Sequence, residues 1–186
     1  MDLLKEKYNK EVLPQLMEKF GYKNIMAAPK ITKATINVGV GKGLNDSSFN
    51  ELVEKTLNRI TGQKPTQIKA KKSIAAFKIR AGQVVGYKVT LRGIRMYDFL
   101  NKLVHVAFPR VRDFHGLDPK KNIDQHGNMT LGFKEHIVFP EISFDEVERV
   151  HGLEISVTTT ATTRDEGFEL FKLLGFPFKK VEDKLR

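Results

Sequence analysis

Three segments of this 186-residue sequence alternate between apolar and polar residues, and this period of two constrains the fold most. Successive side chains of a strand point to opposite faces of a sheet, so each segment predicts a strand with one buried face. Residues 130–139 are also strand-like. The expected buried sets are Ala34, Ile36, Val38 and Val40; then Val85, Tyr87, Val89 and Leu91; and finally Leu153, Ile155, Val157, Thr159 and Ala161.

Other segments carry apolar residues at helical spacing, which predicts helices between and around these strands. Their ends are set by prolines, glycines and capping residues. The expected helices are residues 2–20 with a kink or break at Pro14, residues 49–60 with an N-cap offered by Asp46-Ser47-Ser48, capping-box spacing of Ser48 and Glu51 and an end at Gly62, residues 96–107 ending before Pro109, and a final helix from the cap Thr163 to Gly175.

This order of elements predicts an α+β fold, with helices packed on one face of a mainly antiparallel sheet. We expect residues 1–186 to form a single domain, with a long basic loop at about 69–82 and a turn-rich loop at about 109–128. No apolar run approaches the roughly 18 to 20 residues of a membrane span, and the charged, amphipathic start is unlike a signal peptide. The chain lacks Cys, which excludes disulfides and thiol chemistry. We therefore expect a cytoplasmic protein without a membrane partner.

The formal charge of +10 is concentrated in one stretch. Residues 55–97 contain eleven Lys and Arg and no Asp or Glu, whereas the remainder holds 21 basic and 22 acidic residues. A segment of a single sign is typical of a surface that binds a polyanion. Interspersed charges would serve solubility as well, and no basic amphipathic helix suggests a membrane surface. Nucleic acid is therefore the favoured partner.

The opposite bias occurs near the C-terminus. Residues 141–169 contain eight acidic side chains and two basic ones, Arg149 and Arg164. Repulsion would keep this region away from phosphates, so we expect it to face solvent or a basic protein.

The spacing of polar residues gives little support for catalysis, a metal or a cofactor. The glycines of residues 39–43 lack the spacing of a phosphate loop or a dinucleotide fingerprint, and we expect a turn with positive φ there. The five His are spread without a close pair, which argues against a metal site. Asp113, His115 and Asp118 could imitate an acid–base set, but no nucleophile accompanies them. We expect neither an enzyme nor a bound cofactor.

Two of the predicted strands each carry a row of hydrogen-bonding side chains on the polar face. The rows are Lys33, Thr35 and Asn37 on one strand and Lys88, Thr90 and Arg92 on the other. An ordinary half-solvated sheet would look similar, but the second row lies inside the acid-free stretch. Lys and Arg suit phosphates, and Asn and Thr suit sugar hydroxyls and base edges. Aromatic residues do not line these faces, so the implied target is shaped, helical RNA, with DNA as second choice.

Several motifs resemble the bacterial large-ribosomal-subunit protein L5 family, which binds 5S ribosomal RNA. The resemblance is carried by Ala70-Lys71-Lys72-Ser73-Ile74-Ala75, Lys88-Val89-Thr90-Leu91-Arg92-Gly93 and Arg95-Met96-Tyr97-Asp98-Phe99-Leu100. It continues through Ile36 to Gly41, Gly62 to Pro65, Pro109 to Phe114 and Phe139 to Ile142, and so covers nearly the whole chain in order. Residues 181–186 extend beyond the usual family end.

The resemblance implies an α+β protein of the central protuberance, with partners in 5S rRNA, 23S rRNA, P-site tRNA, other 5S-associated proteins and a basic small-subunit head protein. Carried over by position, it implies that Asn37, Gln63 and Thr90 hydrogen-bond to 5S rRNA, that a loop over 69–82 approaches the tRNA and that residues 134–150 form the intersubunit bridge. Together with the polar rows, the expected 5S rRNA contacts are Lys33, Thr35, Asn37, Gln63, Lys88, Thr90 and Arg92. The expected tRNA contacts are Lys69, Lys71, Lys72, Ser73, Lys78 and Arg80, and those of the bridge are Glu141, Asp145 and Glu146.

Three other functions remain open at this point. The chain could be a general RNA-binding protein or RNA chaperone outside the ribosome, an enzyme that acts on RNA, or an adaptor that binds only proteins. The enzyme lacks a convincing catalytic set, and the adaptor leaves the acid-free stretch unexplained.

Overall fold

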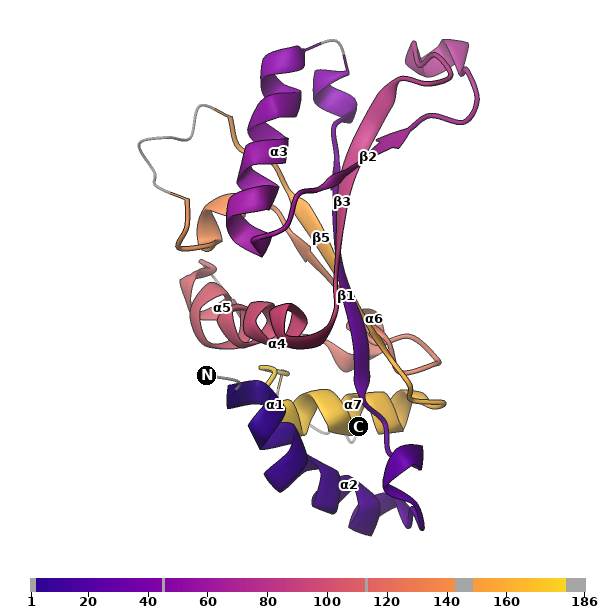
Figure 1. Cartoon of the computed structure of the whole chain (residues 1–186), viewed down its shortest axis with the longest axis vertical. Helices are drawn as coiled ribbons and strands as arrows, with labels where there is room; N and C mark the ends of the chain where they lie inside the picture. Colours follow the sequence, from indigo (N-terminus) through magenta and orange to yellow (C-terminus); the bar gives the residue numbers. More distant parts are fainter. Residues whose placement is uncertain (1–2, 45, 113, 143–148, 180–186) are drawn as a thin grey trace, which may run out of the picture. The chain divides into compact units, whose positions relative to one another are not determined.

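The computed structural model describes residues 3–44, 46–112, 114–142 and 149–179 (Figure 1). It contains a five-stranded sheet with the order β2-β3-β1-β5-β4, which with the helices confirms the predicted α+β class and antiparallel sheet. None of the described helices is long and apolar enough to cross a membrane. The strands are β1 (Ile31–Gly39), β2 (Thr66–Lys69), β3 (Val84–Leu91), β4 (Met129–Phe133) and β5 (Leu153–Thr159).

The three alternating segments form β1, β3 and β5, as predicted, but Val85 is only half-buried, and Ala161 is half-buried and lies beyond the end of β5. In β1 the side chains of Ala34, Ile36 and Val38 are at most 1% exposed, while Asn37 and Gly39 are exposed on the other face. The strand expected over residues 130–139 is wrong in length, because β4 ends at Phe133 and a 3-10 turn, His136–Val138, follows. Beyond β4 the N–H of His136 donates to the carbonyl of His151, two residues before β5.

The chain divides into two compact units, which are described separately. The first consists of residues 1–33, 92–130 and 156–186, and the second of residues 34–91 and 131–155. The expectation of a single domain over 1–186 stays a prediction.

In the second unit, α3 (Ser47–Thr61) packs on β3 (Figure 1). Its N-cap is Asp46, the first of the three residues Asp46-Ser47-Ser48 offered as a cap by the sequence, rather than Ser48 of the expected capping box. The Asp46 carboxylate accepts hydrogen bonds from the backbone N–H groups of Ser48 and Phe49. The predicted end is confirmed, since Gly62 adopts a left-handed conformation with φ of 64°.

Residues 39–43 do not form the turn with positive φ that we expected. Val40 is followed by a 3-10 turn, Gly41–Gly43, and the positive-φ glycines of the described chain lie elsewhere. Gly43 is required for another reason. A Cβ at this position would collide with the ring of Phe49, so the turn can lie against α3 only without a side chain.

The first unit contains two helical stretches, each widened by a π turn next to a proline. One runs through α1 (Leu3–Lys7), a π turn (Tyr8–Val12) and α2 (Leu13–Phe20). The other runs through α4 (Gly93–Lys102), a π turn (Leu103–Ala107) and α5 (Phe108–Arg110).

The π turns explain how both prolines are accommodated. Pro14 and Pro109 stand at the start of α2 and α5, where a missing N–H is least costly. The residue four positions before each proline lies in the wider π turn, which moves its carbonyl away from the ring. Pro14 therefore interrupts the helix as predicted, whereas the expected end before Pro109 is wrong by two residues.

The remaining elements of the first unit are held by side-chain caps. A capping box of Thr163 and Glu166 begins α7 (Arg164–Leu174), as the cap Thr163 predicted, and Gly175 ends it. The turn-rich loop contains the short helix α6 (Pro119–Asn122), capped by Asp118. The Asp124 carboxylate accepts hydrogen bonds from the backbone N–H groups of His126 and Asn128, so this long loop is tightly turned rather than open.

Candidate nucleic-acid interface

The two predicted polar rows meet on one face of the second unit. β1 and β3 pair antiparallel, with Thr35 opposite Thr90 and Asn37 opposite Lys88. Asn37 and Lys88 are exposed and both Thr are half-buried. The opposite face is apolar, and Tyr87, which is 3% exposed, belongs to it. Directly opposed residues of an antiparallel pair lie about 4.5–5.5 Å apart at Cβ, so the four side chains form one continuous surface.

β2 widens this surface by a third strand. Thr66 stands opposite Lys88 on β3 and is exposed, so the row Thr66, Lys88 and Asn37 crosses three strands. Sequence reasoning missed Thr66, because a four-residue strand carries too few alternations to reveal its faces. We call the surface made of these residues, Thr35 and Thr90 the polar sheet face.

Gln63 joins the polar sheet face through its side chain. Its Nε2 donates to the carbonyl of Thr90 at 3.3 Å, and its backbone N–H donates to the Thr61 hydroxyl at 3.3 Å. The Thr61 hydroxyl in turn donates to the carbonyl of Leu57 at 2.7 Å, within α3. Only the NH2 group of the amide can approach a carbonyl, so the Gln63 oxygen is left as an acceptor for a ligand.

Two of the predicted 5S rRNA residues lie in the first unit instead. Lys33 is half-buried, and Arg92 is exposed at the N-cap of α4, where its side chain makes no capping hydrogen bond. Lys33 lies on β1 on the same side as Thr35 and Asn37, and Arg92 directly follows β3, while the name polar sheet face is kept for the residues of the second unit.

The predicted tRNA loop is the connection between β2 and β3, which extends beyond both strands (Figure 1). The Ser73 hydroxyl accepts the backbone N–H of Ala81 at 2.9 Å, and Ile74 bridges to Ile79. Ser73 thus helps to close the loop, in addition to any role toward a ligand. The basic side chains predicted here, Lys69, Lys71, Lys72, Lys78 and Arg80, are all exposed.

The tip of this loop combines charge with exposed apolar side chains. Residues Ala75–Phe77 form a 3-10 turn, and Lys78 closes it with φ of 55°, the one positive φ at a non-glycine position among the described residues. Ile74 is 45% exposed and Phe77 is 68% exposed. An exposed aromatic ring among lysines can stack on a base as well as contact an apolar surface.

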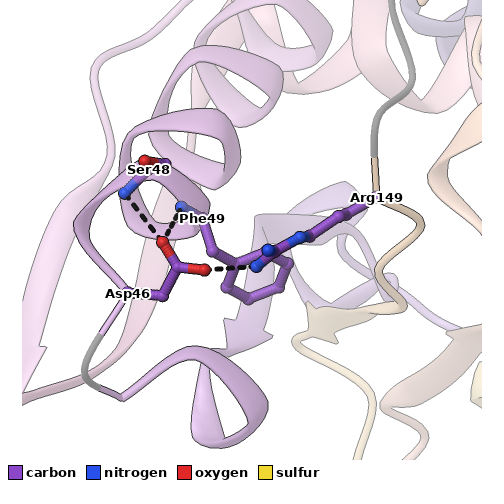
Figure 2. A network of polar contacts seen from close by, with 4 residues as sticks. All are labelled: Asp46, Ser48, Phe49 and Arg149. Atoms are coloured by element: carbon purple, nitrogen blue, oxygen red, sulfur yellow. Dashed lines mark hydrogen bonds and ion pairs between the residues drawn. The ribbon is translucent and has the colours of Figure 1, made fainter.

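The structure covers only part of the predicted bridge set. Glu141 is half-buried, and Asp145 and Glu146 lie outside the described residues. The segment is tied to α3 at its far end, where the Arg149 guanidinium donates to the Asp46 carboxylate (Figure 2). The Arg149 hydrogen bond, together with the one from Phe49 N–H, lowers the pKa of Asp46. Asp46 therefore caps α3 and pairs with Arg149 through its two oxygens.

A pair of buried histidines closes the same segment. His136 and His151 are 1% and 6% exposed, and the edge of the Phe49 ring meets His151 with centroids 6.4 Å apart. Burial, followed by the neighbouring His136, lowers the pKa of His151 to about 4. No sequence signal indicated this pair, because residues so far apart in the chain meet only through the fold. Among the described residues, no three His, Cys, Asp or Glu gather as metal ligands.

Comparison with known proteins gives consistent matches along the chain. Residues 24–80 match the family described as Ribosomal protein L5, and residues 84–178 match the ribosomal L5 family C-terminus. The large ribosomal subunit protein uL5 of Streptococcus thermophilus is 56% identical over 177 residues, covering 95% of this chain and 98% of the relative. The protein of the same name from Desulforamulus reducens is 53% identical over 181 residues, with 97% and 99% covered. That of Halothermothrix orenii is 51% identical over 180 residues, with 97% and 100% covered.

Proposed function

Because this chain belongs to the ribosomal L5 family, we propose that it binds 5S rRNA and helps to attach it in the central protuberance. As a member of this family it is a structural constituent of the large subunit of the cytoplasmic ribosome and not an enzyme. The polar sheet face and Gln63 are the proposed 5S rRNA contacts. Lys33 and Arg92 are proposed to add contacts from the first unit.

The observation that carries this proposal is the register of β1 and β3. It sets Asn37 opposite Lys88 and Thr35 opposite Thr90, so that a phosphate-binding side chain stands among neutral hydrogen-bonding groups. Phosphate contacts supply affinity and position, while neutral donors and acceptors contact sugars and base edges. The absence of acidic residues between positions 55 and 97 leaves β2 and β3 without repulsion toward RNA.

Titration of the full-length protein with a 5S rRNA transcript over a series of KCl concentrations tests the proposal. Affinity should fall with salt, because each neutralised phosphate releases a counterion. Lys88→Gln should reduce the slope of log affinity against log salt by about 1, and the exposed Lys120→Gln, from α6, should leave it unchanged. An affinity independent of salt would contradict binding through phosphates.

The neutral residues are expected to act differently from Lys88. Asn37→Ala and Thr90→Ala should weaken 5S rRNA binding by about 1–3 kcal/mol, because an RNA group is left without its hydrogen-bond partner. The salt slope should stay as in the wild type, since no charge is removed. Folded variants with full affinity would remove Asn37 and Thr90 from the interface.

The loop between β2 and β3 is proposed to contact P-site tRNA, and the segment around Glu141 is proposed to bridge to a basic protein of the small-subunit head. The loop supports its role by its exposed lysines and by its extension beyond the strands (Figure 1). The excess of acidic residues over 141–169 supports the bridge. 23S rRNA and other 5S-associated proteins are proposed as further neighbours.

A further inference from the structure

One glycine next to the polar sheet face has no steric role in holding the fold together. Gly39 is exposed at the end of β1, on the same face as Asn37. Its φ is not positive, and a Cβ built there meets no heavy atom within 4 Å. Glycine in a strand costs conformational entropy and forfeits side-chain packing, so a larger residue would suit the isolated protein as well or better.

Gly86, the residue opposite Gly39, is by contrast a glycine that the fold requires. Gly86 on β3 pairs with Gly39, and a Cβ there would lie 2.9 Å from the carbonyl oxygen of Val38. Gly86 is therefore needed for the strands to approach each other. Gly39 is not needed for this approach. Both glycines leave this part of the sheet surface without a side chain.

The neighbours of Gly39 indicate what approaches it. Asn37 and Lys88, the opposed pair of the polar sheet face, lie two residues along their strands from Gly39 and Gly86, or about 7 Å. A nucleic-acid strand held by these two side chains would extend over the adjacent positions on either side. Toward Thr35 and Thr90 it would meet hydroxyl groups, and toward Gly39 and Gly86 only main chain.

We propose that Gly39 is the point of closest approach between the protein main chain and the sugar–phosphate backbone of the bound RNA. This inference rests on the proposed function and adds a steric requirement to it: the ligand, not the fold, excludes a side chain at position 39. Any side chain there lifts the RNA from Asn37 and Lys88.

A matched pair of glycines allows the test. Gly132 in β4 is also exposed and lacks a positive φ, and a Cβ there would meet no heavy atom within 4 Å, but β5 separates its strand from β1 and β3 in the sheet. The full-length variants Gly39→Ala, Gly39→Val, Gly132→Ala and Gly132→Val are compared with the wild type. Urea unfolding followed by circular dichroism measures stability, and binding to a 5S rRNA transcript is measured over a series of KCl concentrations.

Gly39→Ala and Gly39→Val should unfold at the same or higher urea concentration than the wild type. Their affinity for RNA should fall at least about fivefold, more for Val than for Ala, which is the range expected from forcing extra atoms into a close contact. The salt slope should remain that of the wild type, because the loss is steric and no charge is removed. Both Gly132 variants should bind as the wild type does.

Different outcomes separate this inference from the proposed function. A wild-type protein without affinity for 5S rRNA would overturn the proposed function, and this inference with it. Wild-type binding with equal affinity in Gly39→Val would overturn the inference alone. Clear destabilisation of Gly39→Ala would also overturn it, since the fold would then require the glycine.

Discussion

The imidazole rings of His136 and His151 stack face to face, with centroids 4.0 Å apart and planes inclined by 6°. The backbone N–H of His151 donates to Nδ1 of His136 at 3.2 Å, and the N–H of His136 donates to the carbonyl of His151 at 3.1 Å. Nδ1 of His136 also lies 3.2 Å from the carbonyl oxygen of His151, so this nitrogen accepts from the N–H in one tautomer and donates to the carbonyl in the other. Both rings are buried, and burial disfavours a positive charge on either of them.

Stability should consequently fall as the pH drops. The pKa of His151 is lowered from 6.5 to about 4, and burial also lowers that of His136. Between these values the unfolded chain binds more protons than the folded one, so the free energy of unfolding decreases with decreasing pH. The His151 shift alone corresponds to about 2 kcal/mol lost between about pH 7.5 and about pH 5, as measured by urea unfolding.

Substitution of His151 measures how much of this pH dependence of stability comes from its ring. The difference in unfolding free energy between the two pH values should shrink in His151→Gln and stay unchanged in His115→Gln, because His115 is exposed. The readout is a difference within each variant, so a general loss of stability in His151→Gln does not affect it. An undiminished pH dependence in His151→Gln would assign the effect to other groups.

Asp46 has two functions that substitutions can separate. Asp46→Asn keeps an oxygen for the N–H groups of Ser48 and Phe49 but weakens the pair with Arg149, and Asp46→Ala removes both. The free energy of unfolding in urea should be highest for the wild type, lower for Asp46→Asn and lowest for Asp46→Ala. Arg149→Ala should resemble Asp46→Asn, and its difference from the wild type should shrink at 1 M NaCl, because salt screens an exposed pair. Equal stability of Asn and Ala variants would mean that the cap contributes nothing.

The strands and most helix ends could be predicted from the sequence because their signals are local. Alternation buries Ala34, Ile36 and Val38 whatever the neighbouring strand is, and Gly62 ends α3 through its own backbone. The register could not be predicted in the same way. That Asn37 faces Lys88 depends on which strands pair and where, and neither strand alone carries that information.

The errors occur where distant residues override a local pattern. Of the three residues offered as a cap, Asp46 is the one that also binds Arg149 from another part of the chain, and the capping-box spacing of Ser48 and Glu51 does not decide the cap. The strand over 130–139 ends at Phe133, and the ring of His136 beyond it stacks on His151. Glycine spacing at positions 39–43 suggested backbone conformation alone, whereas the need at Gly43 comes from the ring of Phe49.

The loop between β2 and β3 should be separable from the polar sheet face by charge removal. Changing its five exposed basic residues to Gln should leave 5S rRNA affinity within about twofold, because Asn37 and Lys88 are untouched, and should weaken retention of P-site tRNA on reconstituted ribosomes. The residues are Lys69, Lys71, Lys72, Lys78 and Arg80.

The control removes the same charge from exposed positions of the first unit, Lys23, Lys30, Lys120, Lys121 and Arg164. This variant should keep tRNA as the wild type does. Parallel loss of 5S rRNA and tRNA binding in the loop variant would show that the loop and the polar sheet face form one binding surface.

Gly43 and Gly41 provide a test of why the turn after β1 is rich in glycine. A Cβ at Gly43 collides with the ring of Phe49, which contacts His151 edge-on, while a Cβ at Gly41 meets nothing within 4 Å. Gly43→Ala should therefore lower the free energy of unfolding by about 1–3 kcal/mol, because the Phe49 ring must leave its position. Gly41→Ala should be neutral or slightly stabilising in the same urea titration. If the two variants were equally stable, the Phe49 ring would have room to move, and the contact would not explain the glycine at position 43.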